Sequence, residues 1–519
     1  MHPGTFAASR PDHPAVVLHP AGLVQTYAEL DAAANRFARA LRRLGLQPGD
    51  RIAILLPNCL RYLEIAWAAQ RSGLYYVPVN HHLKAAETEY IVRDCGARVL
   101  VAHADLLPAC TADDISCADD ISCAVEFLVV VDGEPPAGGL SNAALSYEAL
   151  CAAESPTLPD DAAEGVWMFY SSGTTGRPKG IVPDAVGDPL GTLKPFDHIV
   201  RHHFGYDENL RYLVPAPLYH AAPLGWSIAA HRVGGTVVVL ERFDAEECLA
   251  AIERYRITHA QFVPTHFVRM LKLPPEVRAR YDLSSLRVVI HAAAPCPVDV
   301  KEAMIDWLGP IVTEFYSGSE GVGFCMISSE EWLAHRGSVG RPALGVPHIL
   351  DDDGNELTTG QIGQIWFDTP NTFDYHNDPD RTAQSWNDRG WATFGDLGYL
   401  DAEGYLYLAD RRADLVISGG VNIYPREAED VLVLHPGVAD VACVGVPDPE
   451  LGQVLAAAVQ PAAGADAAAL PAELDAFVRD RLSTFKCPRR YVVVDEVPRL
   501  PTGKLLRRDL LARLSPLDN

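Results

Sequence analysis

The sequence predicts an α/β protein with two parts: a large N-terminal α/β domain of several subdomains at residues 1–411, and a small α+β domain at 412–519. Strand-like apolar runs alternate with helix-like segments up to about residue 400, an order typical of parallel sheets buried between helices. Near residue 410 a charged segment, 410–414, is followed by a shorter set of strands and helices of the size of a small domain. The length of 519 residues also favours roughly two to four domains.

The first long helix is predicted to begin at a capping box, Thr26-Tyr27-Ala28-Glu29. In this pattern the threonine hydroxyl accepts from an early helix amide while the glutamate reaches back to the cap. Gly45 is the expected stop before a strand at 51–56. The apolar residues of the segment recur at the three-and-four spacing of one helical face: Leu30, Ala33, Ala34, Phe37, Ala38 and Leu41.

The alternation continues along the chain. The six residues ADDISC at 112–117 are repeated at 118–123, which we interpret as an insertion in a surface loop because loops accept added length cheaply. Further helices are predicted at 62–73, 85–95, from about Pro425, and at 474–482, and further strands at 74–79, 98–102, 126–131, 236–240, 260–263, 286–290, 364–367 and 441–446.

Composition excludes several classes of protein. Lys and Arg number 43 against 68 Asp and Glu, a net charge of −25, which opposes binding to nucleic acid or anionic membranes. The eleven cysteines show no Cys-x-x-Cys pair, so neither a disulfide framework nor a zinc site is indicated. We find no secretion signal and no apolar run long enough to span a membrane. A cytoplasmic enzyme is expected, with a homodimer as one open assembly.

The most informative stretch is YSSGTTGRPKG at 170–180. Its backbone amides, hydroxyls and ammonium could surround a polyphosphate. The spacing of Gly173 and Lys179 does not satisfy the P-loop pattern. The remaining alternative is an ordinary flexible loop, but such loops seldom combine so many hydroxyl residues with Pro-Lys-Gly. The candidate phosphate ligands are Ser171, Ser172, Gly173, Thr174, Thr175 and Lys179.

This stretch resembles the phosphate-binding signature of the adenylate-forming (ANL) superfamily. That superfamily contains acyl-CoA synthetases, the adenylation domains of nonribosomal peptide synthetases and firefly-type luciferases. The resemblance spans almost the whole chain, because supporting segments occur in the expected order at 217–220, 263–265, 292–295, 314–320, 390–396, 410–411, 417–420 and 501–504.

The resemblance implies a two-step reaction. A carboxylate attacks the α-phosphorus of ATP to give an acyl-adenylate and pyrophosphate, and a thiol then displaces AMP. Because an anionic nucleophile approaches an anionic electrophile, a metal and fixed cations are needed. The implied cofactors are ATP and Mg²⁺, with CoA as cosubstrate, and the implied enzyme is an AMP-forming acyl-CoA synthetase, an acid-thiol ligase.

The resemblance also implies roles for individual residues in ATP binding. Glu320 would hold Mg²⁺, Tyr316 would stack on adenine, and Asp396 would accept the ribose hydroxyls. Arg411 would complete the ribose contacts. A solvated surface charge is the alternative for Glu320 and for Arg411. The remaining implied ATP-binding residues are Ala293, Ala294, Pro295, Glu314, Phe315 and Ser319. Phe394, just before Gly395-Asp396, departs from the family pattern, which usually has a small hydroxyl residue there.

Lys504, in a Pro-Thr-Gly-Lys turn, would be the catalytic lysine that the mobile C-terminal domain brings to the α-phosphate. His220 would act as a gate between ATP and the acyl pocket, with a structural histidine as the alternative. Gly419 and Gly420 would line the CoA pantetheine tunnel, because absent side chains let a thin chain pass close to backbone. Ala413 occupies the hinge position, where relatives commonly carry Asp or Lys, and this puts thioester formation in more doubt than adenylation.

Small residues recur at the implied acyl-pocket positions, which indicates a roomy apolar cavity for a bulky carboxylic acid: polycyclic, steroid-like, terpenoid, aryl or fatty. Amino acids are disfavoured, since 220–226 offers no Asp for a substrate amine. Plain core packing is the alternative for these alanines and glycines. Two rival functions stay open: a half-enzyme that hands acyl-AMP to a separate transferase or carrier protein, and a noncatalytic binding protein, which the presence of Lys179, Glu320, Asp396, Arg411 and Lys504 disfavours. A luciferase-type oxygenase shares the first half-reaction, but nothing in the sequence indicates oxygen chemistry. The proposed lining residues are Tyr219, Ala221, Ala222, Trp226, Ala292, Gly321, Gly323 and Phe324.

Overall fold

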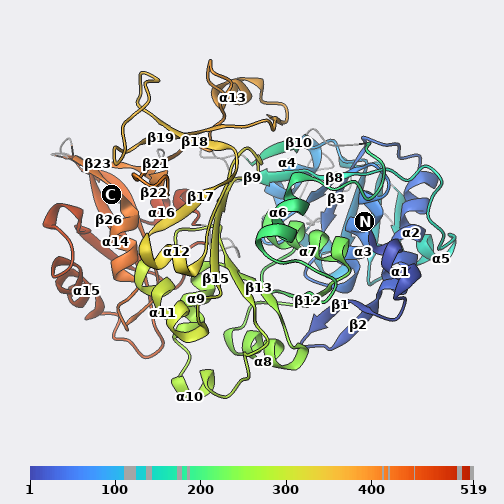
Figure 1. The fold of residues 1–519 in the computed structure, drawn as a ribbon, viewed down its shortest axis with the longest axis horizontal. Coiled ribbons are helices and arrows are strands. Elements are labelled where there is room, and N and C mark those ends of the chain that lie inside the picture. The colour runs from blue at the N-terminus through green and yellow to red at the C-terminus, as the bar shows by residue number, and fades with distance from the viewer. Residues whose placement is uncertain are drawn as a thin grey trace. The chain divides into compact units, whose positions relative to one another are not determined.

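The structure is a computed structural model, and it divides the chain into two compact units (Figure 1). Unit 1 comprises residues 1–262, 273–290 and 372–383, and unit 2 comprises 263–272, 291–371 and 384–519. The duplicated hexapeptide lies outside the described residues. The structure describes residues 1–83, 85–109, 124–135, 143–171, 178–183, 187–411, 414–418, 421–448, 451–499 and 505–514.

Unit 1 contains a six-stranded sheet whose strands are all parallel, as the alternation of elements predicts. The helix α4 (Ala85–Asp94) buries Ile91 and Val92 in the core on this sheet. In order across the sheet the strands are β7 (Ala143–Ser146), β6 (Phe127–Val131), β5 (Val99–His103), β3 (Arg51–Leu55), β4 (Tyr75–Pro78) and β8 (Val166–Trp167).

The predicted capping box is confirmed at the start of α2 (Tyr27–Arg43). The amide of Glu29 donates to Thr26 Oγ1 over 3.2 Å, and the amide of Thr26 donates to Glu29 Oε2 over 2.8 Å. The helix packs along α3 (Leu60–Gln70), which follows β3 (Figure 1). The two α-helices therefore form one layer of unit 1, as expected for a strand and helix alternation.

A second sheet of unit 1 has the strand order β14-β13-β11-β12-β1-β2. The hairpin of β1 and β2 is antiparallel and was not predicted, whereas β12 matches the predicted strand at 236–240. The strands are β1 (Pro14–His19), β2 (Leu23–Thr26), β11 (Arg211–Val214), β12 (Thr236–Leu240), β13 (His259–Phe262) and β14 (Val288–His291). The remaining helices of this unit are α1 (Pro3–Ser9), α5 (Tyr147–Ala152), α6 (Pro195–His203), α7 (Ala221–Val233), α8 (Ala245–Tyr255), α10 (Pro275–Arg278) and α13 (Pro379–Gln384).

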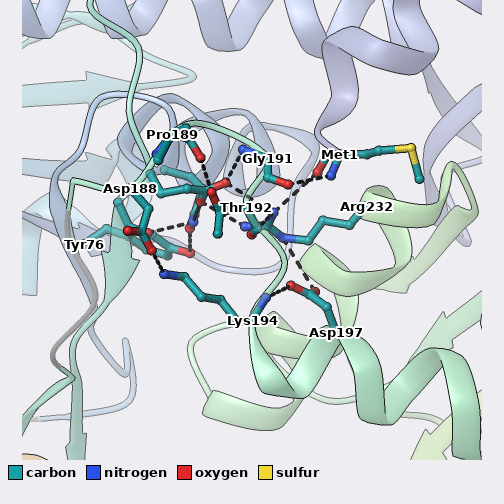
Figure 2. Close-up of polar contacts among 12 residues, drawn as sticks. Met1, Tyr76, Asp188, Pro189, Gly191, Thr192, Lys194, Asp197 and Arg232 are labelled. Carbon is teal, nitrogen blue, oxygen red and sulfur yellow. Dashed lines mark hydrogen bonds and ion pairs between the residues drawn. The ribbon is translucent and has the colours of Figure 1, made fainter.

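A buried ion pair lies at the end of α7 (Figure 2). Arg232 Nη2 donates to Glu164 Oε2 over 2.9 Å, and Arg232 lies 3.7 Å from Asp197 in α6. Glu164 also accepts from the amide of Gly191 over 2.5 Å, and Arg232 donates to the carbonyl of Thr192 over 3.3 Å. The pair thereby ties the segment around 187–197 to the body of unit 1.

Unit 2 contains an antiparallel sheet with the order β18-β19-β21-β22-β17-β16-β15. The predicted strand at 364–367 exists, but it belongs to this antiparallel sheet and not to a parallel one. That strand, β19, pairs antiparallel with β18 and with β21. Further along the same sheet, β21 and β22 are separated by only 401–405, too short for a parallel crossover. The strands are β15 (Val312–Ser317), β16 (Phe324–Ile327), β17 (Ser338–Leu344), β18 (Val346–Leu350), β19 (Gly363–Asp368), β21 (Asp396–Leu400) and β22 (Leu406–Arg411).

The last part of unit 2 forms a separate five-stranded sheet with its own apolar clusters on the two faces. The predicted helix from about Pro425 is confirmed as α14 (Pro425–Leu432), while α15 (Leu470–Arg479) begins four residues earlier than expected. The boundary at 411 and 412 stays a prediction. The strands are β23 (Val416–Ser418), β24 (Val421–Ile423), β25 (Val438–Asp448), β26 (Gly452–Pro461) and β27 (Arg490–Val493), and the other helices of unit 2 are α9 (Pro264–Leu271), α11 (Val298–Leu308), α12 (Ser329–Ala334) and α16 (Arg507–Leu514).

A membrane-spanning helix was searched for in the described ranges. None of the helices there has the length and apolar character needed to cross a bilayer.

Candidate active site

A hydrogen bond joins two predicted nucleotide-binding residues in unit 2. Tyr316 Oη donates to Asp396 Oδ2 over 2.6 Å. Tyr316 lies near the end of β15 and Asp396, 9% exposed, is the first residue of β21, in register with Arg411 of β22. A carboxylate has about four acceptor positions, so one bond to tyrosine orients the group and leaves capacity for the two hydroxyls of a ribose.

The ring of Tyr316 is held by two phenylalanines. Phe394 meets it edge to face with ring centroids 5.8 Å apart, and Phe367 of β19 lies at 6.3 Å. The unusual Phe394 therefore packs against the tyrosine predicted to stack on adenine. Gly318 makes this packing possible, because a Cβ there would lie 2.5 Å from the Phe394 ring and 2.5 Å from Glu320 Oε2.

Glu320 is half-buried beside an exposed Ser319. Within the described ranges no cluster of three or more His, Cys, Asp or Glu side chains could hold a metal ion. Mg²⁺ in nucleotide enzymes is typically held by one or two carboxylates together with substrate phosphates. A single carboxylate at Glu320 therefore fits an ion that arrives with ATP, and it does not fit a dedicated protein cage.

The predicted adenine-facing segment is a turn after β14. Ala293 has φ of 75°, in the left-handed region that L residues other than Gly, Asn and Asp seldom adopt. Ala293 and Pro295 are exposed, whereas Ala292 is 5% exposed. Strained backbone of this kind persists where the surroundings fix it, and it clusters at functional sites.

The carboxylate of Glu314 faces the interior, where it pairs with Lys301 of α11. Lys301 Nζ lies 2.6 Å from Glu314 Oε2 and 4.9 Å from the centre of the Trp332 ring, and Lys301 is fully buried. Burial alone would raise the pKa of Glu314, but the charge and hydrogen bond of Lys301, together with the neighbouring His291 and Arg426, outweigh burial and lower the pKa. The sequence analysis missed Lys301. The available signal was a lysine beside the buried Val300, Met304 and Ile305 of the same helix.

His291 adjoins this pair on the other side. Its Nε2 lies 3.5 Å from Glu314 Oε2, and burial lowers the pKa of His291 to about 3, so the imidazole is neutral. His291 ends β14 immediately before the 292–295 turn, and Glu314 precedes Tyr316 by two residues on β15. The neutral His291 and the charged Glu314 therefore bring the ends of the two backbone segments predicted to face adenine close together.

Two predicted acyl-pocket positions of unit 2 serve packing. A Cβ on Gly323 would lie 2.6 Å from the Phe367 ring, so the absent side chain makes room for that ring. Phe324 stacks on Phe315 with centroids 5.0 Å apart and 7° between planes, and both are buried. Gly321 differs: its φ is 70° and nothing lies within 4 Å of a Cβ there. Pocket lining by these residues stays a prediction.

Lys179 begins β10 (Lys179–Pro183) in unit 1. This strand pairs with β9 (Phe169–Ser171) and with β20 (Phe373–Tyr375), and Lys179 is in register with Ser171 across the hairpin. Lys179 Nζ lies 5.8 Å from the centre of the Tyr375 ring. Burial and the charge of Arg381 lower the pKa of Lys179. The two ends of the predicted phosphate-binding loop are thus held side by side.

The predicted gate, His220, precedes α7 and is held in place by a residue that the sequence analysis missed. Asn58 Nδ2 donates to the carbonyls of Ala216 and Leu240 over 3.2 and 2.7 Å, and Asn58 Oδ1 accepts from the amide of Leu218 over 2.8 Å. An asparagine after a buried strand was the only local signal. These bonds fix the chain just before Tyr219 and His220, whose rings lie 4.4 Å apart.

The other predicted pocket residues of unit 1 lie on α7. Ala221 and Ala222 are half-buried in its first turn. Trp226 is 1% exposed and packs edge to face against Phe196 and Phe204, with centroids 5.3 and 4.8 Å away. Its ring is therefore a core residue of unit 1, and a role as pocket wall stays a prediction.

Two cysteines near the predicted site are inert. Cys296 is 5% exposed and Cys325 fully buried, and burial raises the pKa of both thiols, that of Cys325 to about 12. A thiolate is the reactive form of cysteine, so neither is a candidate nucleophile. The cysteines of the described ranges are all free, as the sequence predicts.

Several predicted site residues lie outside the described residues, and their roles stay predictions: Ser172, Gly173, Thr174, Thr175, Ala413, Gly419, Gly420 and Lys504. Only the backbone is described for Ser171 and Arg411.

Comparison with known proteins gives consistent matches over the whole chain. Residues 5–375 match the family model of the AMP-binding enzyme, and residues 427–504 match that of the AMP-binding enzyme C-terminal domain. A feruloyl-CoA synthase of Amycolatopsis sp is 34% identical over 508 residues, 96% of each chain. The fatty acid–[acyl-carrier-protein] ligase ScoC of Streptomyces coeruleorubidus is 33% identical over 98% of this chain and 94% of its own. The solved structure of the anthranilate CoA ligase AuaEII in complex with anthranoyl-AMP superposes with a TM-score of 0.82 at 25% identity, covering 98% of this chain and 96% of that one.

Proposed function

The chain belongs to the AMP-binding enzyme family, and on this basis we propose that it is an ATP-dependent acyl-CoA ligase for a bulky, apolar carboxylic acid. The observation that carries the proposal is the Tyr316–Asp396 hydrogen bond, because it sets an aromatic ring and an oriented carboxylate side by side, as a nucleoside requires. Relatives named for feruloyl-CoA and for fatty acid support an aryl or fatty acid over an amino acid.

In the first half-reaction a carboxylate oxygen of the acid bonds to the α-phosphorus of ATP, and the bond from that phosphorus to the bridging oxygen breaks. Acyl-AMP forms and pyrophosphate leaves. Asp396 accepts the ribose hydroxyls and Tyr316 stacks on adenine, with Ala293, Ala294 and Pro295 against the other face of the base. Lys179 and the hydroxyls of Ser171 to Thr175 hold the phosphates, and Lys504 acts at the α-phosphate. Positioned charge of this kind commonly supplies the largest share of rate enhancement.

Glu320 is the residue of this chain that would hold Mg²⁺, together with oxygens of the nucleotide. The ion, when bound, neutralises charge on the phosphates. In the second half-reaction the CoA sulfur bonds to the acyl carbonyl carbon, the bond from that carbon to the AMP oxygen breaks, and the thiol proton is lost. Gly419 and Gly420 would let the pantetheine arm pass close to backbone.

The alternative is a half-enzyme that passes acyl-AMP to a carrier protein or transferase. Two observations favour it: the relative ScoC is named as an acyl-carrier-protein ligase, and Ala413 cannot make the polar contacts of the Asp or Lys common at the hinge. The adenylation step is the same in both proposals, and they differ only in the acceptor.

The test incubates the protein with ATP, Mg²⁺ and a panel of aryl, fatty and polycyclic acids, with and without CoA. Mass spectrometry follows acyl-AMP and acyl-CoA separately. Acyl-CoA with AMP and pyrophosphate is expected. Acyl-AMP that accumulates despite CoA would instead establish the half-enzyme. If none of the acids in the panel leads to release of pyrophosphate, both proposals are overturned. An Ala413→Lys variant in rapid-quench experiments reports on the hinge, since a faster thioester step alone would show that alanine slows it.

A further inference from the structure

Four polar aromatic residues of unit 1 form a group beside the predicted gate. This polar cluster consists of Tyr62, His81, His82 and Tyr219. His81 and Tyr219 are in edge-to-face contact with ring centroids 5.2 Å apart, and His81 lies 4.2 Å from His82. Burial raises the pKa of Tyr62 well above its usual value, and the neighbouring Tyr219 hydroxyl raises it further. The cluster is therefore continuous from Tyr62 to His82.

The position of the cluster in the fold is one where ligands bind. Tyr62 lies in the first turn of α3 after β3, His81 follows the end of β4, and Tyr219 follows the end of β11. All three segments come after the carboxyl ends of parallel strands. In open α/β sheets the ligand crevice lies outside these ends.

Three side-chain atoms of the cluster are buried and have no hydrogen-bond partner among the described residues: Tyr62 Oη, Tyr219 Oη and His81 Nδ1. Tyr62 is fully buried and Tyr219 is 4% exposed. Buried tyrosine hydroxyls nearly always find a partner, because an unmade bond costs the full desolvation of the group. Three such atoms in one cluster indicate a missing polar group.

The chemistry of the three atoms specifies that group. Burial lowers the pKa of His81 to about 4, so its ring is neutral, and a backbone hydrogen bond with Leu56 acts on the ring in the opposite direction. Since Nδ1 has no partner among the described residues, we assign the bond with Leu56, and the ring proton, to Nε2, which makes Nδ1 an acceptor. A tyrosine hydroxyl can donate or accept. An aliphatic chain would satisfy none of them, and a ketone oxygen cannot donate to the histidine. A hydroxyl group can donate to His81 Nδ1 and accept from a tyrosine.

We propose that the polar cluster binds a hydroxyl group on the acyl part of the substrate, so that the preferred acid is a hydroxylated aryl or polycyclic acid. This rests on the proposed function, because it takes the segment around Tyr219 as the acyl pocket. The cluster makes specificity depend on one hydrogen-bonding group within an otherwise apolar site. A site that hydrogen-bonds a substrate hydroxyl rejects the analogue without it far more strongly than an apolar pocket rejects a missing methylene.

The experiment compares pairs of acids that differ by one hydroxyl, such as 4-hydroxycinnamate with cinnamate and 12-hydroxydodecanoate with dodecanoate. The ratio of kcat/KM within each pair, followed by pyrophosphate release, is measured for the wild type and for Tyr219→Phe and Tyr62→Phe. We expect at least one pair to favour the hydroxylated acid tenfold or more in the wild type, and this preference to fall below threefold in Tyr219→Phe. A general loss of activity cancels in the ratio.

The matched control is Tyr212→Phe, which removes an equally buried hydroxyl that already donates to Gln261 Oε1 over 2.7 Å and should leave the ratio unchanged. Isothermal titration calorimetry without ATP measures the binding affinity for each acid of a pair, so it tests the inference even if no acid is adenylated. A failure to release pyrophosphate overturns only the proposed function. If no pair is discriminated by the wild type in either assay, or if Tyr219→Phe and Tyr62→Phe both keep the preference, a buried water satisfies these atoms and the proposal is wrong.

Discussion

Tyr316 and Asp396, 80 residues apart in the sequence, are joined by a 2.6 Å hydrogen bond from the tyrosine hydroxyl to the carboxylate. Tyr316 therefore has two functions: its ring offers a flat surface, and its hydroxyl orients the carboxylate of Asp396. Phe394, two residues before Asp396, packs against the same ring. The nucleoside site that we propose in unit 2 is therefore a packed cluster and not a set of separate side chains.

The first prediction concerns this bond. Tyr316→Phe keeps the ring and removes the hydroxyl, and bonds to charged groups contribute about 1.5–3 kcal/mol. We expect the KM for ATP to rise by about tenfold or more, with a smaller change in the KM for the acid. If the bond orients Asp396 toward the ribose, the variant should also lose part of the wild-type preference for ATP over 2′-deoxy-ATP. An unchanged preference in steady-state kinetics would show that Asp396 is oriented without the tyrosine.

The second prediction concerns the buried pair of Lys301 and Glu314, which links the strand of Tyr316 to α11, the helix that follows the turn at 292–295. Removing one partner of such a pair costs about 3–5 kcal/mol, because an uncompensated charge stays buried. We expect Lys301→Met to lower the thermal midpoint and to raise the KM for ATP. The double variant Lys301→Met with Glu314→Gln should recover part of both losses. Losses that simply add in the double variant would contradict coupling between the two groups.

The third prediction uses the ion pair of Arg232 and Glu164 as a matched control. This pair is equally buried and lies in unit 1 (Figure 2). Within the described ranges, the side chains of Arg232 and Glu164 contact Met1, Gln70, Gly191, Thr192 and Asp197, none of which is a predicted ATP-binding residue. Arg232→Met should therefore destabilise the protein by a similar amount, about 3–5 kcal/mol, while the KM for ATP of the folded protein stays within about twofold. Urea unfolding and initial-rate kinetics on the same preparations separate the two effects. A KM increase as large as that of Lys301→Met would remove the argument that Lys301 has a positioning role.

The fourth prediction concerns Asn58, whose side chain bonds to Ala216, Leu218 and Leu240. Asn58→Ala removes these bonds, each contributing about 0.5–1.5 kcal/mol, and releases the chain before Tyr219 and His220. We expect the KM for the acid to increase more than the KM for ATP. Equal increases in both constants would mean that Asn58 supports the unit in general and not the acyl pocket.

Sequence reasoning succeeded where the determining interactions are local. The capping box of Thr26 and Glu29 spans three residues, and the strand at 236–240 is a continuous apolar run, so both are visible in a short window. The parallel sheet of unit 1 followed from the alternation of such elements. The antiparallel sheet of unit 2 did not, because strand direction there depends on connections whose lengths were not weighed.

The site divides in the same way. Tyr316, Glu320 and Asp396 were found by resemblance to a family, and their spacing alone would not have paired them. Asn58 bonds to a segment 158 to 160 residues away, so no local pattern reveals it. Lys301 gave a weak signal, a charge among apolar residues of a helix, but its partner Glu314 could be identified only once the helix was packed on β15.

The fifth prediction concerns pH and rests on His231 in α7. The histidine is fully buried, accepts from Trp67 Nε1 at Nδ1 over 2.9 Å and lies 3.1 Å from the carbonyl of Ala15 through Nε2. The tautomer with a proton on Nε2 satisfies both neighbours, and protonation of Nδ1 would break the bond to Trp67. Burial lowers the pKa of His231 to about 4, against about 6.5 in an unfolded chain.

The sign of the effect follows from this difference. Between pH 6.5 and 4 the unfolded chain binds a proton that the folded protein does not, so the stability contributed by neutral His231 is present above pH 6.5 and is lost as the pH falls. At about 1.36 kcal/mol per pH unit, lowering the pH from 7.5 to 5.0 costs about 2 kcal/mol at this site. His231→Gln offers an acceptor and a donor to the same two partners without titrating. Urea unfolding at the two pH values should therefore show a smaller acid loss in the variant by about that amount, and an identical loss in both proteins would mean that His231 is not the titrating group.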